Sequence, residues 1–493
     1  MKKFNLTLTA LTAALVLAGC STAKPPETLK LDTPAAYREK AEPLQGEWKV
    51  AKPADNTDRG QWWKVYGDDN LSKLIVEATE SNPNLTAAFA RVKESRAIAG
   101  VVDADRGFQL GAGFGPTRVG GVQPNVPTPD GVSPPPSTQW RAGANFSYEV
   151  DLFGRLSDAS RAAQLDADAQ EAAYHSVLLT LQADVAQQYF TIRALDSEID
   201  VLEKTVNLRQ EALDLAKHRF DAGDTSELDV AQAKTEWATT SAELEGVRRE
   251  RAQRDHALAV LLGQAPAQFS LPVAPLQASI VTVPAGLPSD LLERRPDIAQ
   301  AQRQMAAASS RIGAAKAAFF PSLVLTGSGG YASNELRDLF KWSSRSWILG
   351  PLSGTLLNLP IFDGGRNRSN LARADADYEA LVANYRQQVL VGFRDVEDNL
   401  SALRTLDRQM VFEDQATKSS QLATRLADSR YRYGSASYFE VIDAQRSSLA
   451  TQRSLIRSQG QRAVASVGLI RALGGGWDSP VEKDKDVPPI AKQ

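Results

Sequence analysis

The clearest pattern in the chain is a long run of apolar residues at alternating spacings of three and four. Neither glycine nor proline occurs between Gly154 and Gly223, and only Gln188 and Arg209 break the register. The apolar positions are Leu178, Leu181, Val185, Ile192, Leu195, Ile199, Leu202, Val206, Leu213, Ala216 and Phe220. At about 1.5 Å per residue, one helix over this run is about 100 Å long. The sustained seven-residue period predicts that this helix packs as a coiled coil.

A second pattern, with a period of two residues, predicts membrane β-strands. From Trp140 to Leu152 the even positions are apolar, whereas the odd positions are polar, charged or glycine. The length suits a strand that crosses a bilayer. A charge on the lipid side costs about 2–4 kcal/mol at the midplane, so we expect the polar face to look into water. The hairpin partner of this strand is marked by Leu110, Ala112 and Phe114.

The second half of the chain repeats the alternation on odd positions. One strand is marked by Leu323, Leu325 and Tyr331; the other is interrupted by prolines and is marked by Trp347, Leu349, Leu357, Leu359 and Ile361. We therefore expect four strands, near residues 106–118, 138–153, 321–333 and 346–362.

Comparison of the chain with itself shows a tandem duplication. At an offset of 211 residues, identical residues recur without a gap; among them are Arg155 with Arg366, Tyr174 with Tyr385, Gly223 with Gly434, and Gly263 with Gly474. We expect a first repeat over 62–263, a linker over 264–288 and a second repeat over 289–477. Each repeat begins with a helical run (71–105 and 289–318), continues into strands, and ends in a long helix, a glycine turn and another helix.

Four strands form an open sheet, and lipid does not tolerate an open sheet edge. The chain is therefore expected to share a barrel with copies of itself. Two copies give eight strands, whose interior is filled by side chains, so three or more copies are needed for a lumen. Strand counting does not separate three copies from four. The predicted fold class is mainly α with a membrane β part.

The N-terminus has the layout of a bacterial export signal. Two lysines precede a short apolar stretch over 6–18, and Leu17-Ala18-Gly19-Cys20 follows. This ending resembles a lipoprotein cleavage site, at which Cys20 is acylated and becomes the mature N-terminus; the alternative is a plain signal peptide with an accidental cysteine. We expect a signal peptide over 1–19, a lipidated tether over 20–61 and a polar tail over 478–493.

Composition narrows the classes of function. The net charge of −3 leaves no basic excess for a nucleic acid, and three histidines with one cysteine are too few for a metal site built on those ligands. The glycines near 111–113 and 327–330 do not form a phosphate-binding loop between a strand and a helix. No catalytic constellation or cofactor site stands out, so we expect that the protein is not an enzyme.

Several motifs together resemble the outer-membrane efflux factor family, the TolC-like channels. They are Trp62-Trp63-Lys64-Val65-Tyr66-Gly67-Asp68, Asn82-Pro83, Asp151-Leu152-Phe153-Gly154-Arg155, Phe362-Asp363-Gly364-Gly365-Arg366 and Leu473-Gly474-Gly475-Gly476-Trp477. Lipidation at Cys20 is similar to the branch paired with resistance-nodulation-division pumps. The resemblance implies a homotrimer in the outer membrane, a shared twelve-stranded barrel, and a long α-helical periplasmic tunnel.

The same resemblance implies a passive export duct for small toxic compounds such as drugs. Its partners are then a periplasmic adaptor (a membrane fusion protein) and an inner-membrane transporter. Two alternatives remain open: an outer-membrane duct for type I protein secretion, and a periplasmic coiled-coil scaffold lipoprotein without a channel.

Two turns, Asp221 to Leu228 and Tyr433 to Phe439, are predicted to form the periplasmic tip. Each has a glycine after the long helix, as a helix end favours, and the chain then reverses into a new helix. By resemblance, the adaptor meets this tip at Gly223, Asp224, Gly434 and Ser435.

The second tip turn is followed by two carboxylates, Glu440 and Asp443, on one face of a predicted helix. The first repeat has Asp229 and Gln232 at the equivalent places. Acidic residues are commonplace in a first helical turn, where the helix dipole favours them. By resemblance, Glu440 and Asp443 line the periplasmic gate, with Phe439 beside them as an apolar plug. Three copies would then bring about six carboxylates into a ring that selects cations.

Overall fold

The computed structural model describes residues 60–119, 136–277, 294–349 and 357–475. The predicted signal peptide, Cys20 and the polar tail lie outside these residues, as do most of the tether and part of the linker. The described chain is mainly helical, with five short or medium strands, which confirms the predicted fold class. It divides into two compact units: residues 92–170 with 301–385, and the remaining described segments.

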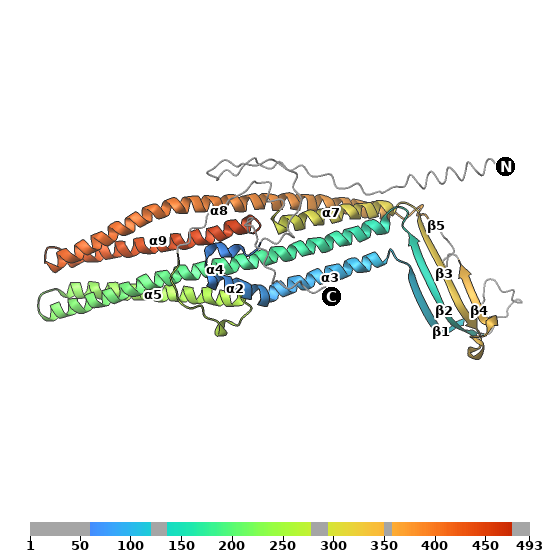
Figure 1. Cartoon of the computed structure of the whole chain (residues 1–493), viewed down its shortest axis with the longest axis horizontal. Helices are drawn as coiled ribbons and strands as arrows, with labels where there is room; N and C mark the ends of the chain where they lie inside the picture. The colour runs from blue at the N-terminus through green and yellow to red at the C-terminus, as the bar shows by residue number, and fades with distance from the viewer. Residues whose placement is uncertain (1–59, 120–135, 278–293, 350–356, 476–493) are drawn as a thin grey trace. The chain divides into compact units, whose positions relative to one another are not determined.

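The two repeats have the same helices at matching positions. The long helix is α4 (Arg155–Asp221) in the first repeat and α8 (Arg366–Arg432) in the second, each of 67 residues. It is followed by α5 (Glu227–Leu261) and α9 (Tyr438–Ala472), each of 35 residues. In Figure 1, α5 runs back along α4 and α9 runs back along α8. All four pairs of boundaries differ by the predicted offset of 211 residues.

The first helical run of the first repeat is broken at a proline, and residues 289–293 of the run in the second repeat lie outside the described residues. Instead of one helix over 71–105, the chain forms α2 (Asp69–Ser81) and α3 (Pro83–Ala104). The break lies at Asn82, which is extended because the ring of Pro83 disfavours a helical residue before it. In the second repeat the described helix is α7 (Pro296–Ala317), which begins at the equivalent proline.

Four of the strands form an antiparallel sheet in the order β1-β2-β3-β4 (Figure 1). They are β1 (Gln109–Val119), β2 (Ser137–Val150), β3 (Ser322–Ser333) and β4 (Arg345–Leu349); β5 (Leu357–Asn358) also pairs with β3. Residues 350–356 of the fourth predicted strand lie outside the described residues, and its last described pair, at Asn358, comes before the expected end at residue 362. Leu359 and Ile361 lie beyond its last pair, because Pro360 has no N–H to continue the ladder.

The register of the sheet separates an apolar face from a polar face. Cross-strand partners share a face, so Trp140, Phe146 and Tyr148 of β2 lie with Phe114 of β1 and Tyr331 of β3. The opposite face carries Arg141, Asn145, Ser147 and Glu149. The predicted alternation is correct in both repeats, including the change from even to odd positions.

Helices of the same unit are tied to one another beside the sheet. Ser160 of α4 donates to Asp103 of α3 at 2.8 Å, and Arg311 of α7 pairs with Asp166 of α4. The rings of Phe153 and Phe320, each next to a strand end, stack at 4.7 Å between centroids. These contacts fix the helix ends from which the strands emerge.

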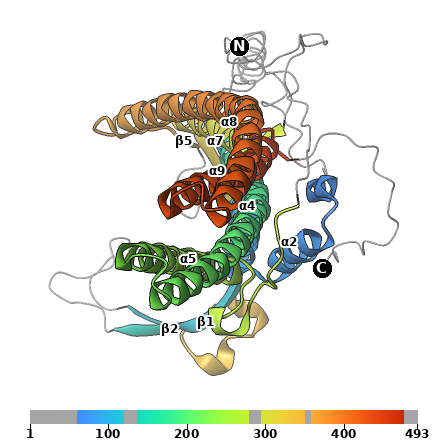
Figure 2. The ribbon, with the colours of Figure 1, turned by 90° about the vertical axis from the view of Figure 1, so that its left-hand side faces the viewer.

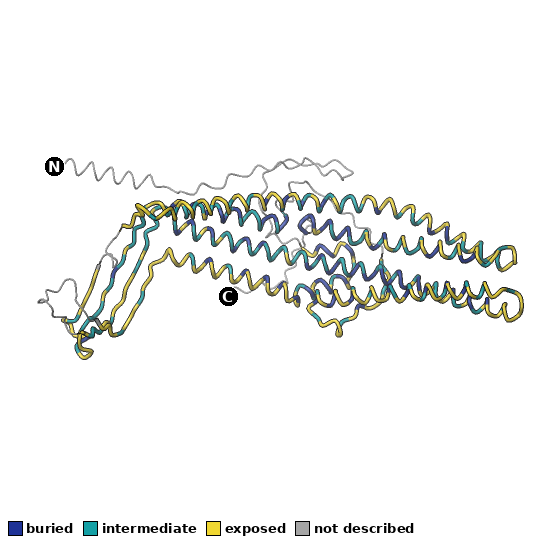
Figure 3. The backbone as a smooth tube through the Cα atoms, turned by 180° about the vertical axis from the view of Figure 1, so that it is seen from behind, coloured by how far each residue is buried: buried dark blue, intermediate teal, exposed yellow. Residues whose placement is uncertain are grey.

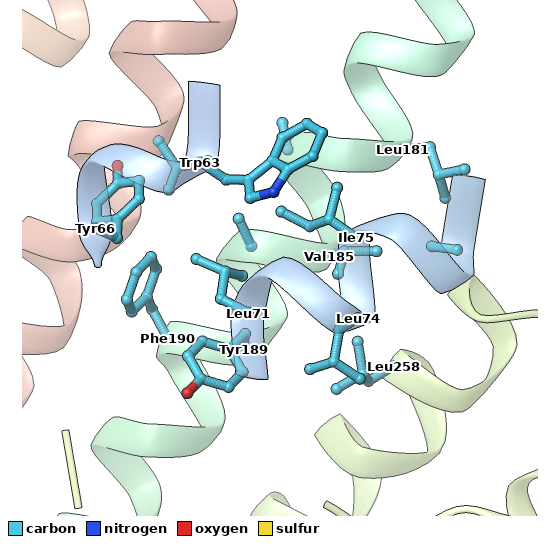
Figure 4. Close-up of a cluster of buried hydrophobic side chains, with 14 of the residues drawn as sticks. Trp63, Tyr66, Leu71, Leu74, Ile75, Leu181, Val185, Tyr189, Phe190 and Leu258 are labelled. Carbon is cyan, nitrogen blue, oxygen red and sulfur yellow. The ribbon is translucent and has the colours of Figure 1, made fainter. Parts of the chain in front are cut away.

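The adjacent tryptophans Trp62 and Trp63 are buried in the hydrophobic core of the other unit, part of which is drawn in Figure 4. The 3₁₀ helix η1 (Trp62–Tyr66) and α2 pack against α4, α5 and α9; their buried side chains are Trp62, Trp63, Tyr66, Leu71, Leu74, Ile75 and Ala78. Tyr66 shares a hydrogen bond with Ser466 of α9 at 2.8 Å, and Trp62 donates to Gln182 of α4 at 3.2 Å. Burial raises the pKa of Tyr66 to about 12. Figure 3 shows buried residues concentrated in this region.

An equivalent junction closes each repeat. The side chains of Asn82 and Arg295, each before a proline, donate to the carbonyls of Leu261 and Ala472, the last residues of α5 and α9. Gly263 and Gly474 follow these helices, and both have positive φ. A Cβ added at Gly263 would lie 2.5 Å from the backbone oxygen of Ser81, and one added at Gly474 would lie 2.6 Å from that of Arg294. Glycine is required there by both conformation and space.

We predict that Gly263→Ala destabilises the protein more than Gly223→Ala. Both residues have positive φ (+72° and +79°), so both variants bear the left-handed penalty of about 1–2 kcal/mol. Only at Gly263 would the new Cβ lie 2.5 Å from the oxygen of Ser81; at Gly223 nothing lies within 4 Å. Thermal unfolding followed by circular dichroism compares the two, and equal midpoints would contradict the close approach.

Candidate gate at the hairpin ends

The two helical hairpins, α4/α5 and α8/α9, end in the same backbone turn. After α4, Gly223 donates to the carbonyl of Phe220 at 2.9 Å and Asp224 to that of Arg219 at 2.8 Å. After α8, Gly434 and Ser435 make the same two bonds, at 3.0 and 2.9 Å. This pair of bonds around a glycine in the left-handed region is the Schellman motif, which satisfies carbonyls at a helix end. The structure thus gives the predicted tip residues one shared conformation.

The third residue of the helix that follows has a different role in each repeat. In α5, the carboxylate of Asp229 accepts from the N–H and hydroxyl of Ser226, at 3.4 and 3.3 Å, and so caps its own helix. In α9, the equivalent Glu440 instead pairs with Arg430 of α8 at 3.1 Å. The longer side chain of Glu440 therefore links the two helices of its hairpin.

The predicted gate residues are all exposed within the single chain. Phe439 is 59% exposed, and Asp443 makes no ion pair within the part of the chain that the structure describes. Glu440 and Asp443 thus share a helix face, as predicted, but only Asp443 keeps an unneutralised carboxylate. The ion pair between Arg430 and Glu440 could not be read from the sequence, because the two residues lie on different helices.

Helix α9 lies beside α4 of the other hairpin (Figure 2). Its arginines bind acidic residues of α4 and α5. Arg446 pairs with Glu236 of α5, and Arg453 pairs with Glu198 of α4 at 2.8 Å and with Glu243 of α5 at 2.6 Å. Arg457 also pairs with Glu198, at 2.7 Å. The hydrogen bond and charge of Glu236 raise the pKa of Arg446, and those of Glu198 raise the pKa of Arg457.

Arg209, one of the two residues that break the apolar register, belongs to this network. Its side chain is buried in α4, pairs with Glu236 at 3.0 Å, and donates to the hydroxyl of Thr240. Burial lowers the pKa of Arg209, although Glu236 opposes that effect. A buried ion pair contributes little net stability but is costly to break, so it favours one specific arrangement of the hairpins.

Aromatic residues join the hairpins closer to the tip. The guanidinium of Arg219 in α4 lies 5.1 Å from the ring centroid of Tyr431 in α8. Tyr438 of α9 packs on a cluster of α4 and α5 that includes Leu213 and Trp237, and burial raises its pKa to about 12. These links are not visible in the sequence, because the partners lie far apart along the chain. Arg446, Arg453 and Arg457 also have no arginine at the equivalent position of the first repeat.

The interiors of the two hairpins differ in polarity. In α4/α5 the helices meet through Leu195, Ile199, Leu202, Leu244 and Val247. At positions equivalent to Leu202, Val206, Leu213, Trp237 and Val247, the α8/α9 hairpin has Glu413, Thr417, Thr424, Ser448 and Ser458. Its helices meet through hydrogen bonds, such as Ser454 to Glu413 at 2.7 Å and Ser420 with Thr451 at 2.8 Å.

This polar interior is only partly satisfied. One carboxylate oxygen of Glu413 and the hydroxyl of Thr417 are buried without a hydrogen-bond partner. Burial by itself would raise the pKa of Glu413, but hydrogen bonds from Gln409, Ser454 and Ser458 hold it below its usual value. At these positions hydroxyl contacts stand in place of buried apolar area, which stabilises a helix pair more. Farther from the turn, Phe393 and Val396 of α8 pack on Leu469 of α9.

Among the described residues, no group of three or more His, Cys, Asp or Glu side chains could hold a metal ion. None of the described helices is long and apolar enough to cross a bilayer.

Known proteins resemble this chain over nearly its whole length. The family described as "Outer membrane efflux protein" matches residues 74–264 and 287–475, one segment in each half. A probable outer membrane lipoprotein, SilC of Salmonella typhimurium, is 33% identical over 96% of this chain and 99% of its own. The outer membrane protein OprJ of Pseudomonas aeruginosa is 34% identical over 97% of both chains.

Solved structures agree with this assignment. The outer-membrane channel OprN superimposes with a TM-score of 0.82 at 28% identity, over 92% of this chain and 98% of that one. The channel CusC gives a TM-score of 0.78 at 31% identity, over 93% and 100%. The family resemblance found in the sequence motifs is confirmed: the chain belongs to the outer membrane efflux protein family, a family of channel proteins.

Proposed function

We propose that this protein is the outer-membrane channel subunit of a tripartite efflux system, in which it serves as a passive export duct. The observation that carries the proposal is the sheet with one apolar and one polar face. Within the described strands, β1 pairs only with β2, and β4 pairs only with β3. Both outer edges must be paired if the apolar face lies in lipid.

Three copies would satisfy those edges with a shared barrel of twelve strands, whose polar faces line a water-filled lumen. The long hairpins would continue the duct into the periplasm. There an adaptor would bind the duct, and an inner-membrane transporter would supply the energy for export. The duct itself would catalyse no reaction. The alternative of a coiled-coil scaffold lipoprotein leaves the two-faced sheet without a use.

The cargo is inferred from relatives. CusC of Escherichia coli is named a cation efflux protein, TtgI of Pseudomonas putida belongs to a toluene efflux pump, and OpmQ of Pseudomonas aeruginosa is named for pyoverdine export. These names share the export of small compounds, which favours small toxic molecules such as drugs over the secretion of a protein.

We predict that the purified protein forms pores with the mass of three chains. In a planar bilayer it should give stepwise conductance that persists as the voltage is raised. A barrel of twelve strands leaves an open lumen, whereas the interior of an eight-stranded barrel is filled by side chains. Native mass spectrometry of the same sample gives the number of chains. A conducting monomer, or a trimer that never conducts, would contradict the proposal.

Lipidation at Cys20 is a separate part of the proposal. A Cys20→Ala variant should no longer incorporate labelled palmitate but should still conduct, because the barrel and not the acyl chain forms the pore. Equal labelling of the variant and the wild type would overturn the lipid anchor alone.

We predict that Glu440→Gln with Asp443→Asn lowers cation selectivity and relieves block by divalent cations. A ring of carboxylates at the gate attracts cations, and the double variant removes about six of them from a trimer. Because Arg430 already pairs with Glu440, Asp443→Asn alone should account for most of the effect on selectivity. Reversal potentials in salt gradients measure this. Asp229→Asn, which changes the cap of α5, is the matched control and should leave selectivity unchanged.

We predict that Gly434→Val abolishes efflux while the trimer still assembles. Gly434 has positive φ, which valine adopts poorly, so the turn that presents Ser435 to the adaptor is distorted. Gly434→Asn should retain activity, because asparagine tolerates this conformation and nothing lies within 4 Å of a new Cβ. Drug accumulation in cells measures efflux. The same two substitutions at Gly223 test the turn that presents Asp224. Full efflux by both Gly223→Val and Gly434→Val would place adaptor docking elsewhere.

A further inference from the structure

The apolar face of the sheet carries charge only at one end. In the described strands its charged residues are Arg118 of β1 and Arg345 of β4; every other position on this face is apolar, glycine, threonine or serine. Both arginines lie at the end of the sheet opposite the helices, because β1 leaves α3 at Gln109 and β4 begins at Arg345 after the β3–β4 loop. This end is the outer one if the helices lie in the periplasm.

The β3–β4 loop, residues 334–344, holds Arg345 in place. Leu339 in the loop is fully buried, Lys341 pairs with Asp338 at 2.7 Å, and Ser344 donates to the carbonyl of Asp338 at 2.7 Å. The Nε of Arg345 donates to the carbonyl of Trp342 at 3.0 Å, and its Cζ lies 3.0 Å from the centroid of the Trp342 ring. One face and one N–H of the guanidinium are thus occupied, which leaves its terminal nitrogens available.

No carboxylate neutralises either arginine among the ion pairs of the described residues. The two acidic residues of the loop, Glu335 and Asp338, pair with Arg337 and Lys341. Arg118 and Arg345 are both exposed, and so are the neighbouring rings of Trp342 (74%) and Trp347 (77%). Tryptophan at the end of a membrane strand is typical of the headgroup region, where a charge on the lipid side costs least.

The two arginines lie on opposite edges of the sheet (Figure 1). Under the proposed trimer, on which this inference rests, the β4 edge of one chain meets the β1 edge of the next. Arg345 of one chain and Arg118 of its neighbour then lie on the same face and at the same end of the seam between them. Each seam of the barrel would carry two cations that the single chain keeps apart.

We propose that Arg118 and Arg345 bind the phosphate group of an anionic lipid in the outer leaflet, with one site at each seam between chains. Guanidinium groups match phosphate oxygens through paired, charge-assisted hydrogen bonds. A free anion from solution would not require the arginines to lie on the apolar face beside tryptophans. A lipid headgroup does, because its acyl chains must lie along the same face.

The test is a titration of the wild-type trimer, in neutral detergent, with lipid A that carries two phosphates. Native mass spectrometry counts bound lipids and chains in one spectrum. Arg118→Gln with Arg345→Gln should weaken binding by about tenfold, as expected for the loss of a charge-assisted hydrogen bond. Arg141→Gln is the matched control: Arg141 lies at the same level, opposite Ala332, but on the polar face, and its removal should leave binding unchanged. Dephosphorylated lipid A should bind the wild type and the double variant equally.

Each outcome decides the inference. Equal affinity of the double variant and the wild type for lipid A would overturn the lipid site while the trimer in the same spectrum leaves the channel proposal intact. An equal loss in Arg141→Gln would show a diffuse charge effect in place of a site. Inorganic phosphate that competes with lipid A at similar concentration would overturn the lipid assignment. A spectrum with monomers alone would remove the shared seam and would contradict the proposed channel as well.

Discussion

The requirement that every backbone group be paired in lipid governs this structure. A sheet of four strands, apolar on one face, has two edges whose N–H and C=O groups cannot be left open in a bilayer. One chain cannot close the sheet, so the edges define both the assembly and the surfaces that meet within it. Arg118 and Arg345 lie on the two strands that form those edges. The polar face becomes a lumen only after closure, and for this reason the function of the single chain is incomplete.

Duplication supplied two hairpins with the same backbone and different interiors. The Schellman turns at Gly223 and Gly434, and the proline junctions at Asn82 and Arg295, repeat with little change because they depend on backbone geometry. The side chains between the helices were free to diverge. Leucine and valine hold α4 to α5 along their interior, whereas α8 and α9 share an apolar cluster around Val396 and Leu469 and meet through hydroxyl groups and Glu413 nearer the turn. The second hairpin is therefore held partly by the first, through Arg446, Arg453 and Arg457.

This division of roles connects packing to the proposed gate. The residues proposed to line the gate follow the turn of the α8/α9 hairpin. This hairpin is joined to α4/α5 by arginines that pair with the buried carboxylates of Glu198 and Glu236, by aromatic contacts, and by Leu449 in the apolar cluster of α4 and α5. Separation of the hairpins would leave those two carboxylates without their arginines, which is costly for buried charges. The apolar α4/α5 hairpin, with the core around Trp63 and Ile75, would serve as the fixed part.

The sequence by itself determined the elements that depend on local or periodic patterns. Period-two alternation defined the faces of β2 and β3, the absence of Gly and Pro defined α4, and the offset of 211 residues related its boundaries to those of α8. Pro83 and Pro360 are visible in the sequence, but the pattern of apolar residues continues on both sides of each proline. The break of the helix at Pro83 and the end of the strand at Pro360 are therefore harder to predict. Only the tertiary structure showed that Glu440 reaches Arg430, that Arg209 is buried against Glu236, and that Arg345 stacks on Trp342. Such pairings join residues by side-chain direction and by packing between distant segments, and neither quantity is encoded in the spacing of residues along the chain.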